Sequence, residues 1–228
     1  MVGLCVALGV WQIERLHWKE GLIAQRAAAL AAPPVAAPST FAEARPLDLH
    51  RVVIDGVFLN DKEVLVHAVA PSSVAQGGIG FDVLTPLREA DGRIVFVNRG
   101  YVPAPLKDAA KRAGGEPRGT AHLSGRLRLP YPAKPGWFIP DNQPGRGEWY
   151  WIDLPTIAAA DGLPDAAPFY IEADATANPG GWPRGSAALP ELPNHHLQYA
   201  ITWFLLALAG TVIFVLSQRR RDGSGPHP

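Results

Sequence analysis

An apolar stretch near the end of the chain dominates its hydrophobic pattern. Residues 197–217 carry no formally charged side chain, and about 21 residues at ~1.5 Å each form a helix of ~30 Å, enough to cross the hydrocarbon core of a bilayer. Tyr199 and Trp203 lie at its start, and Arg219–Arg221 follow its end. Aromatic residues are typical of a membrane interface, and arginines of the cytoplasmic side. The pattern therefore predicts a C-terminal transmembrane helix over residues 194–218, entering from outside, and a cytoplasmic tail at 219–228.

A second apolar run begins the sequence. Residues 1–13 are apolar and charged residues follow from Glu14, so the run measures only ~20 Å as a helix. It lacks the basic region and cleavage site of a secretory signal. We expect an N-terminal transmembrane helix and helical extension over residues 1–32. Because the apolar run is shorter than the ~30 Å hydrocarbon core, either the true start lies upstream of Met1, which we favour, or the helix reaches only part of the way across. Gly3, Ala7 and Val10 share one face, which predicts a small-residue seam against a partner helix.

Between these runs the sequence is rich in strand and turn signals. Residues 33–46 are rich in alanine and proline, which predicts an extended linker. Two β-rich pairs of runs predict hairpins, one from residues 51–59 and 63–67, the other from 80–87 and 93–103 around Asp91-Gly92. Further expected elements are strands at 120–129 and 169–173 and a short helix at 154–161 that follows Asp153 as its N-cap.

These elements together define a fold class and an organisation. We expect a membrane protein in which two transmembrane helices flank a mainly antiparallel β (α+β) extramembrane domain at 47–193, like a sandwich or barrel. With one helix entering and one leaving, the protein is multi-pass, both termini are cytoplasmic and the central domain is outside.

Composition excludes several classes of function. A formal net charge of zero gives no support for nucleic-acid binding through a basic surface. The only cysteine is Cys5 and the only methionine is Met1, so the outside domain has no soft ligand for copper(I) and no intrachain disulfide forms. No nucleophile elbow, phosphate-binding loop or zinc-protease motif occurs, and we expect no enzyme activity.

The candidate chemistry lies at the outer end of the C-terminal helix, where His195 and His196 are adjacent. Neighbouring helical residues point ~100° apart, so the two rings do not chelate one ion together, but one of them can be an axial ligand. The other interpretation is that both cap the helix at the headgroup level. The face of His196 combines aromatic and small residues, which leaves room for a flat macrocycle or a close partner helix: Tyr199, Ala200, Trp203, Ala207, Gly210 and Phe214.

Trp11 and Arg15 lie near the same predicted membrane surface. Interfacial anchoring explains the tryptophan without any ligand. The arginine suits either lipid headgroups or the propionates of a porphyrin. Membrane lipid is therefore an expected partner in both cases.

Eight blocks of sequence carry a resemblance that spans almost the whole chain. They are Leu8-Gly9-Val10-Trp11-Gln12-Ile13-Glu14-Arg15, Gly56-Val57-Phe58, Gly80-Phe81-Asp82-Val83-Leu84-Thr85-Pro86-Leu87, Val97-Asn98-Arg99-Gly100-Tyr101-Val102-Pro103, Gly125-Arg126-Leu127-Arg128, Trp149-Tyr150-Trp151-Ile152-Asp153, Asn178-Pro179-Gly180-Gly181-Trp182-Pro183 and Asn194-His195-His196-Leu197-Gln198-Tyr199-Ala200-Ile201-Thr202-Trp203-Phe204. In this order they resemble the Surfeit-locus (Surf/Shy) family of cytochrome c oxidase assembly factors.

The resemblance implies a function. Members of that family assist maturation of oxidase subunit I, and bacterial members are linked to haem a, so we expect subunit I and other assembly factors as partners and the bacterial inner membrane as location, with a periplasmic domain. The family's histidine matches His196, which becomes the expected ligand of haem iron, with Tyr199, Trp203, Trp11 and Arg15 around the haem. His195 replaces an asparagine of the family pattern and adds a competing imidazole. The alternative is a scaffold that holds oxidase subunits without carrying haem.

Overall fold

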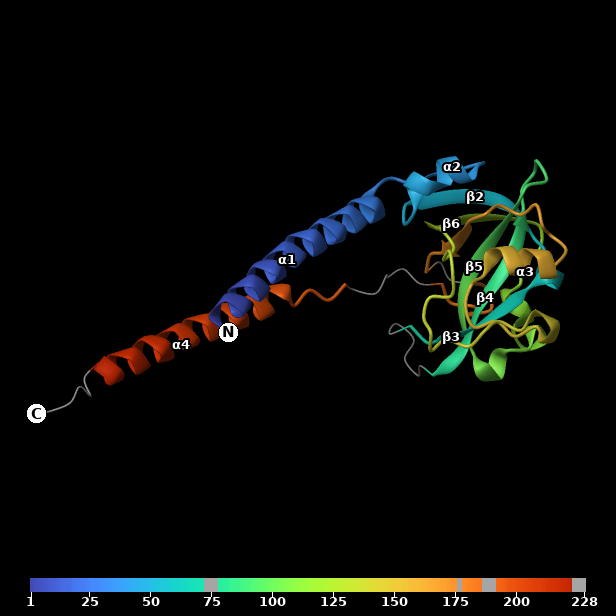
Figure 1. Cartoon of the computed structure of the whole chain (residues 1–228). Coiled ribbons are helices and arrows are strands. Elements are labelled where there is room, and N and C mark those ends of the chain that lie inside the picture. Colours follow the sequence, from blue (N-terminus) through green and yellow to red (C-terminus); the bar gives the residue numbers. More distant parts are fainter. Residues whose placement is uncertain (72–77, 176–177, 186–191, 223–228) are drawn as a thin grey trace, which may run out of the picture. The chain divides into compact units, whose positions relative to one another are not determined.

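The computed structural model describes residues 1–71, 78–175, 178–185 and 192–222 (Figure 1). The chain forms two compact units. One combines residues 1–28 with residues 190–228, and the other comprises residues 29–189. The first is a pair of helices and the second contains the β-sheet.

The helical unit consists of two antiparallel helices, α1 (Val2–Ala31) and α4 (His196–Asp222). Three contacts fix their direction. Gln12 lies beside His196, a Cβ atom added at Gly9 would meet the ring of Phe204, and one at Gly210 would meet Val2. The start of α1 therefore lies against the middle of α4.

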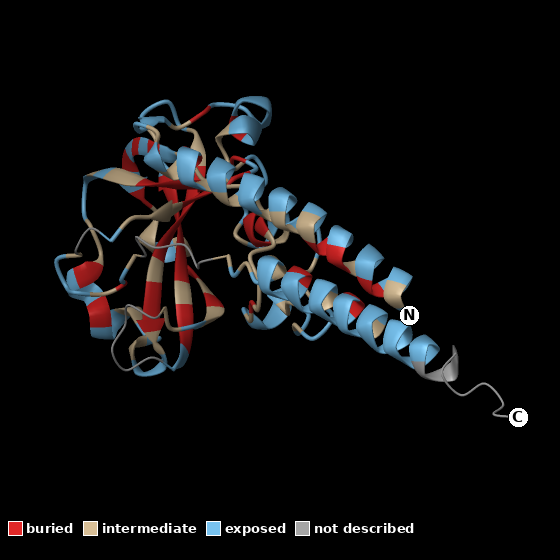
Figure 2. Ribbon diagram, turned by 90° about the vertical axis from the view of Figure 1, so that its left-hand side faces the viewer, coloured by how far each residue is buried: buried red, intermediate tan, exposed pale blue. Residues whose placement is uncertain are grey.

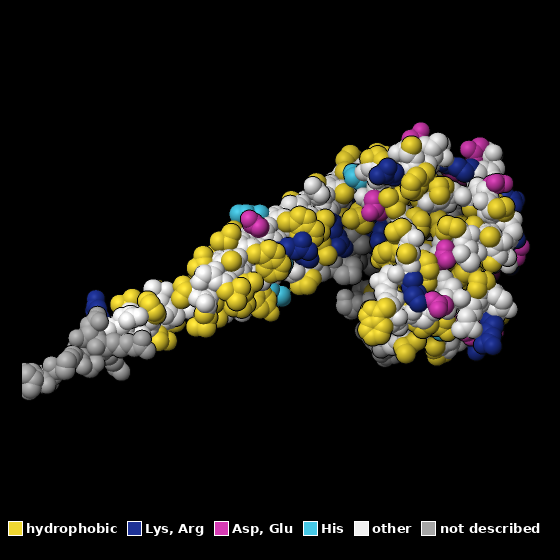
Figure 3. All heavy atoms as spheres, viewed as in Figure 1, with side chains coloured by type: hydrophobic (Ala, Val, Ile, Leu, Met, Phe, Trp, Pro, Cys, Tyr) yellow, Lys and Arg dark blue, Asp and Glu magenta, His cyan; other side chains and the backbone are white. Residues whose placement is uncertain are grey.

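One helix among the described residues is long and apolar enough to span a membrane. It is the segment His196–Arg219 of α4, with a mean hydropathy of 2.2. Apolar side chains cover its surface in Figure 3, and most of it is exposed in Figure 2. The α1 helix carries Glu14, Arg15 and Lys19 within its length, and the second transmembrane helix that the sequence predicts is not confirmed.

The helices meet along a different face of α1 from the one predicted. Gly3, Ala7 and Val10 are exposed, so the expected small-residue seam is wrong. Buried positions are instead Cys5, Gly9 and Gln12 on α1 and Ala200 and Ala207 on α4. Small residues at Gly9, Ala200 and Ala207 let the two backbones approach closely.

In the second unit, the described residues form a seven-stranded sheet that closes on itself. Its order is β1-β2-β6-β7-β5-β4-β3, and a further pairing of β2 with β4 joins Val57 to Arg88 and Phe58 to Leu87. Pairing is antiparallel except between β1 and β2 and between β5 and β7. This confirms the expected α+β, barrel-like domain. The strands are β1 (Val35–Ala36), β2 (Arg51–Phe58), β3 (Val64–Val69), β4 (Ile79–Arg88), β5 (Ile94–Pro103), β6 (Thr120–Arg128) and β7 (Tyr170–Ala173).

One predicted hairpin is confirmed and the other is wrong. The β4–β5 pair turns at Asp91-Gly92, where Gly92 has a φ of 91° and donates its N–H to the Glu89 carbonyl. In contrast, β2 and β3 are joined by the short 3-10 segment Asn60–Lys62 and do not pair with each other. Strand β3 pairs with β4, and β2 pairs along most of its length with β6.

The segment expected to be an extended linker contains structure of its own. Strand β1 pairs with β2, and the short helix α2 (Phe41–Ala44) begins with a capping box between Thr40 and Glu43. Ala44 is fully buried in the domain core. The remaining short elements are α3 (Leu154–Ala160), capped by Asp153 as predicted, and the 3-10 segments Arg45–Leu47, Ala104–Leu106, Ala109–Gly115 and Pro144–Arg146.

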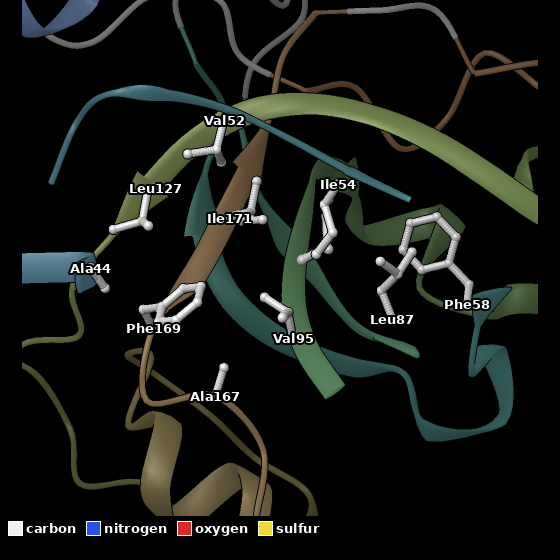
Figure 4. Close-up of a cluster of buried hydrophobic side chains, with 11 residues drawn as sticks. Ala44, Val52, Ile54, Phe58, Leu87, Val95, Leu127, Ala167, Phe169 and Ile171 are labelled. Atoms are coloured by element: carbon white, nitrogen blue, oxygen red, sulfur yellow. The ribbon is translucent and has the colours of Figure 1, made fainter. Parts of the chain in front are cut away.

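Hydrophobic side chains from all parts of this unit fill the barrel. The largest cluster joins α2, strands β2, β4, β5, β6 and β7, and the segment before β7 (Figure 4). Its members alternate with outward-facing residues along β2, where Val52, Ile54 and Phe58 are buried. The period-2 pattern of the strands therefore places one face of each in the core.

Candidate functional site

A hydrogen bond between the two helices defines the candidate site. His196 is the first residue of α4, and its Nδ1 lies 2.7 Å from Oε1 of Gln12 on α1. An amide oxygen only accepts hydrogen bonds, so the imidazole nitrogen that faces it carries the proton. In the neutral ring the other nitrogen, Nε2, then has a lone pair available for a ligand.

The chemistry of this donor suits haem iron. A single half-buried imidazole with its Nδ1–H engaged is the usual arrangement of an axial histidine ligand. Helix α1, however, covers the small residues on the face of His196, since Ala200 and Ala207 are buried in the helical unit. The sequence left room beside this face for either a flat macrocycle or a close partner helix, and the structure has a helix, α1, there.

The structure separates the other predicted site residues. Trp203 is half-buried on the face of His196, whereas the Tyr199 side chain is 57% exposed. Trp11 and Arg15 are also exposed, and the Arg15 guanidinium lies 3.7 Å from the centre of the Trp18 ring. The geometry thus brings His196 together with Gln12, while Trp11 and Arg15 lie on the exposed surface of α1.

His195 has a different environment from its neighbour. Its side chain is exposed, and its carbonyl accepts a hydrogen bond from the Tyr199 N–H at the start of α4. This position corresponds to a helix N-cap. Within the described parts of the chain, no group of three or more histidine, cysteine or carboxylate side chains is arranged to hold a metal ion.

Gln12 is the site residue that sequence reasoning missed. It is only 9% exposed, and it lies in the apolar run between Val10 and Ile13. A polar side chain within such a run is expensive unless it has a partner, and it often marks a functional position. That signal was present in the sequence, but nothing in the pattern indicated that the partner is 184 residues away.

The sheet-containing unit (the β unit) holds a carboxyl with a shifted pKa, that of the half-buried Asp82 on β4. Burial raises the pKa of its carboxyl to about 6, a hydrogen bond from the Asn98 amide opposes the shift, and the negative charge of Glu172 adds to it. A carboxyl with a pKa higher in the folded than in the unfolded chain holds its proton more tightly when folded. Its contribution to stability is therefore largest below pH 4 and is lost as the pH rises through about 6.

We expect Asp82→Asn to remove this pH dependence. A shift from 3.8 to about 6 corresponds to about 3 kcal/mol, so the variant should exceed the wild type in free energy of unfolding by up to that amount at pH 7.5 and by little at pH 4. Denaturant titrations of the two proteins at both pH values measure the difference. The exposed Asp165→Asn is the matched control, and an equal gap at both pH values would contradict the prediction.

The two units together define a class of protein: a membrane-associated α+β protein with a barrel-like domain and an apolar helix that begins at a hydrogen-bonded histidine. The chain belongs to the SURF1 family, whose model matches residues 1–208. It is 37% identical to a SURF1-like protein of Monosiga brevicollis, over 93% of this chain and 83% of that one. Its identity to Surfeit locus protein 1 of Homo sapiens is 33%, over 91% and 71%, and to that of Mus musculus 32%, over 94% and 72%. Membership is consistent with a cytochrome oxidase assembly factor.

Proposed function

We propose that this protein is a non-enzymatic assembly factor for a haem–copper terminal oxidase, and that it carries haem a as cargo to oxidase subunit I. The observation that carries the proposal is the imidazole of His196, with Nδ1 bound to Gln12 and Nε2 available, at the first residue of the apolar helix. Family membership supports the assembly role.

The proposal includes a multi-pass topology in the bacterial inner membrane. Helix α1 begins with an apolar run and lies antiparallel to α4, with its first residues beside Gly210. If both antiparallel helices cross the bilayer, the start of α1 and the end of α4 lie on the same side of it. Arg219–Arg221 follow the apolar part of α4 and favour the cytoplasm for that side. The β unit, which lies between the helices in sequence, is then periplasmic.

The position of His196 suits the chemistry of the cargo. Haem a has an isoprenoid tail, which favours hydrocarbon, and propionates, which favour the headgroup region. A ligand at the mouth of a membrane helix meets both requirements. A carrier must also release its cargo, and a single imidazole ligand supports moderate rather than irreversible binding.

The test is the absorption spectrum of full-length protein purified in detergent from cells that make haem a. We expect a haem a spectrum in the wild type, at least about tenfold less bound haem in His196→Ala, and little change in His195→Ala. The reason is that the Nδ1–H of His196 is held by a hydrogen bond to Gln12. His195→Ala is the matched control. Equal haem content in all three proteins would exclude His196 as the ligand.

A second candidate function is a scaffold that holds oxidase subunits through the β unit. It is favoured by two exposed aromatic neighbours in the loop after β6, Trp137 at 92% and Phe138 at 74% exposure, whose rings lie at 90° to each other. Several prolines flank this loop, which reduces the entropy that binding would cost. Exposed tryptophans are frequent anchors of protein interfaces.

The scaffold makes its own prediction. Replacing Trp137 and Phe138 together by alanine should reduce co-purification of oxidase subunits about tenfold or more, since anchor residues each contribute about 2 kcal/mol or more. Val69→Ala with Ile79→Ala removes two other exposed apolar side chains of the same unit and is the control. If oxidase assembly survives His196→Ala but fails in the aromatic double variant, the scaffold is the function and haem carriage is not.

A further inference from the structure

We propose that Gln12 is a positioning residue for haem binding: its amide oxygen holds the His196 imidazole in the Nδ1–H tautomer and so keeps Nε2 free to ligate iron. This inference rests on the proposed haem-carrying function. It assigns a specific role to Gln12 on α1, whereas the proposed ligand, His196, is on α4.

The surroundings of the pair support this role. Gln12 is buried in the seam of the helical unit, where an amide without a partner would be costly. The His196 ring nitrogen lies 2.7 Å from its oxygen, a short and therefore well-formed hydrogen bond. The bond thus satisfies a buried polar group and orients the imidazole at the same time.

The close approach of the helices positions this hydrogen bond. One turn before Gln12 on α1, a Cβ atom added at Gly9 would lie 2.7 Å from the Phe204 ring, so only glycine lets the backbones come this near without displacing the ring. The contact fixes the register of α1 against α4 and sets which side chain of α1 reaches His196. The His196 imidazole is therefore held by the packing of the two helices rather than by its own backbone alone.

The chemical consequence concerns both the proton and the orientation of the ligand. A neutral imidazole carries its proton on either nitrogen, and a proton on Nε2 blocks coordination there. A hydrogen-bond acceptor at Nδ1 selects the other tautomer and increases the basicity of Nε2. Partners of this kind typically change metal affinity 10-fold to 100-fold.

Three variants of Gln12 separate the acceptor from simple packing. Gln12→Leu keeps the volume but has no acceptor, Gln12→Glu keeps an oxygen at the same distance, and Gln12→Asn keeps the amide but shortens its reach. Gln25→Leu changes an exposed glutamine of the same helix and is the matched control. Each full-length protein is purified in detergent and titrated with ferric haem a.

We expect Gln12→Leu and Gln12→Asn to bind haem a about 10-fold to 100-fold more weakly, and Gln12→Glu to bind within a few-fold of the wild type with a lower midpoint potential. An independent readout needs no haem. Nitrogen NMR of histidine-labelled protein should show a protonated Nδ1 and an unprotonated Nε2 at His196 in the wild type and in Gln12→Glu, and a mixture of tautomers in Gln12→Leu.

The outcomes distinguish this inference from the function on which it rests. If His196→Ala loses haem while Gln12→Leu keeps wild-type affinity and a single tautomer, the role of Gln12 is overturned and the haem carrier stands. If His196→Ala binds haem normally, His196 is excluded as the ligand, and the NMR result then decides only whether Gln12 holds the ring. Should Gln12→Leu fail to fold, rescue by Gln12→Glu with loss in Gln12→Asn supports the acceptor role, and equal behaviour of those two refutes it.

Discussion

Glu63→Ala is expected to destabilise the β unit by about 3–5 kcal/mol. Its carboxylate accepts hydrogen bonds from both terminal nitrogens of Arg112, one of them at 2.8 Å, and Arg112 also donates its Nε–H to the Leu106 carbonyl. The Arg112 side chain is only 1% exposed. Removing the carboxylate leaves a buried positive charge without its counterion, which is far more costly than the loss of the pair as a whole.

Two comparisons isolate this mechanism in thermal or denaturant unfolding of the detergent-purified protein. The double variant Glu63→Ala/Arg112→Met should recover much of the lost stability, because the unpaired charge is gone. Asp141→Ala, which removes the exposed partner of Lys134, should cost less than about 1 kcal/mol. If Glu63→Ala itself lowers the free energy of unfolding by less than about 1 kcal/mol, water or other side chains stabilise the Arg112 charge, and the prediction is wrong.

Gly100→Ala is expected to destabilise the same unit by about 3–4 kcal/mol. Gly100 has a φ of 105°, and a Cβ atom there would lie 2.0 Å from the Arg184 carbonyl oxygen. That backbone is fixed in place, since Tyr101 and Arg184 exchange hydrogen bonds of 2.9 and 3.0 Å. The cost combines backbone strain and overpacking, each about 1–3 kcal/mol.

Gly119→Ala is the control for the strain component. Gly119 also has a positive φ, of 82°, but no atom lies within 4 Å of the position its Cβ would take. Its replacement should cost only about 1–2 kcal/mol. Similar losses at both positions would mean that the Arg184 segment moves aside and that the contact does not constrain β5.

Local signals in the sequence predicted local structure well. Asp91-Gly92 specified the β4–β5 hairpin because a two-strand pair around a tight turn depends on a few neighbouring residues. The strand that pairs with most of β2 is β6, about seventy residues away. No turn or periodicity encodes such a pairing, so local signals alone pair β2 with the next strand, β3, instead.

In the candidate site, too, the sequence predicted local features but not the contacts between distant residues. A helical period was sufficient to place Ala200, Trp203 and Ala207 on the face of His196. Choosing the face of α1 that meets them was not possible from small residues alone, because Gly3 and Gly9 look equivalent in sequence. The decisive residues were a glycine opposite a bulky ring and a buried glutamine opposite a histidine, and both depend on the partner helix.

The last strand of the described residues, β7, lies in the middle of the sheet between β5 and β6. Nearly the whole β unit must therefore leave the ribosome before its barrel can close. A premature stop codon upstream of Tyr170 would leave the facing borders of β5 and β6 open, and open strand borders recruit other chains. Such shortened products should be cleared by proteases or accumulate as aggregates, without retaining a fraction of the normal activity.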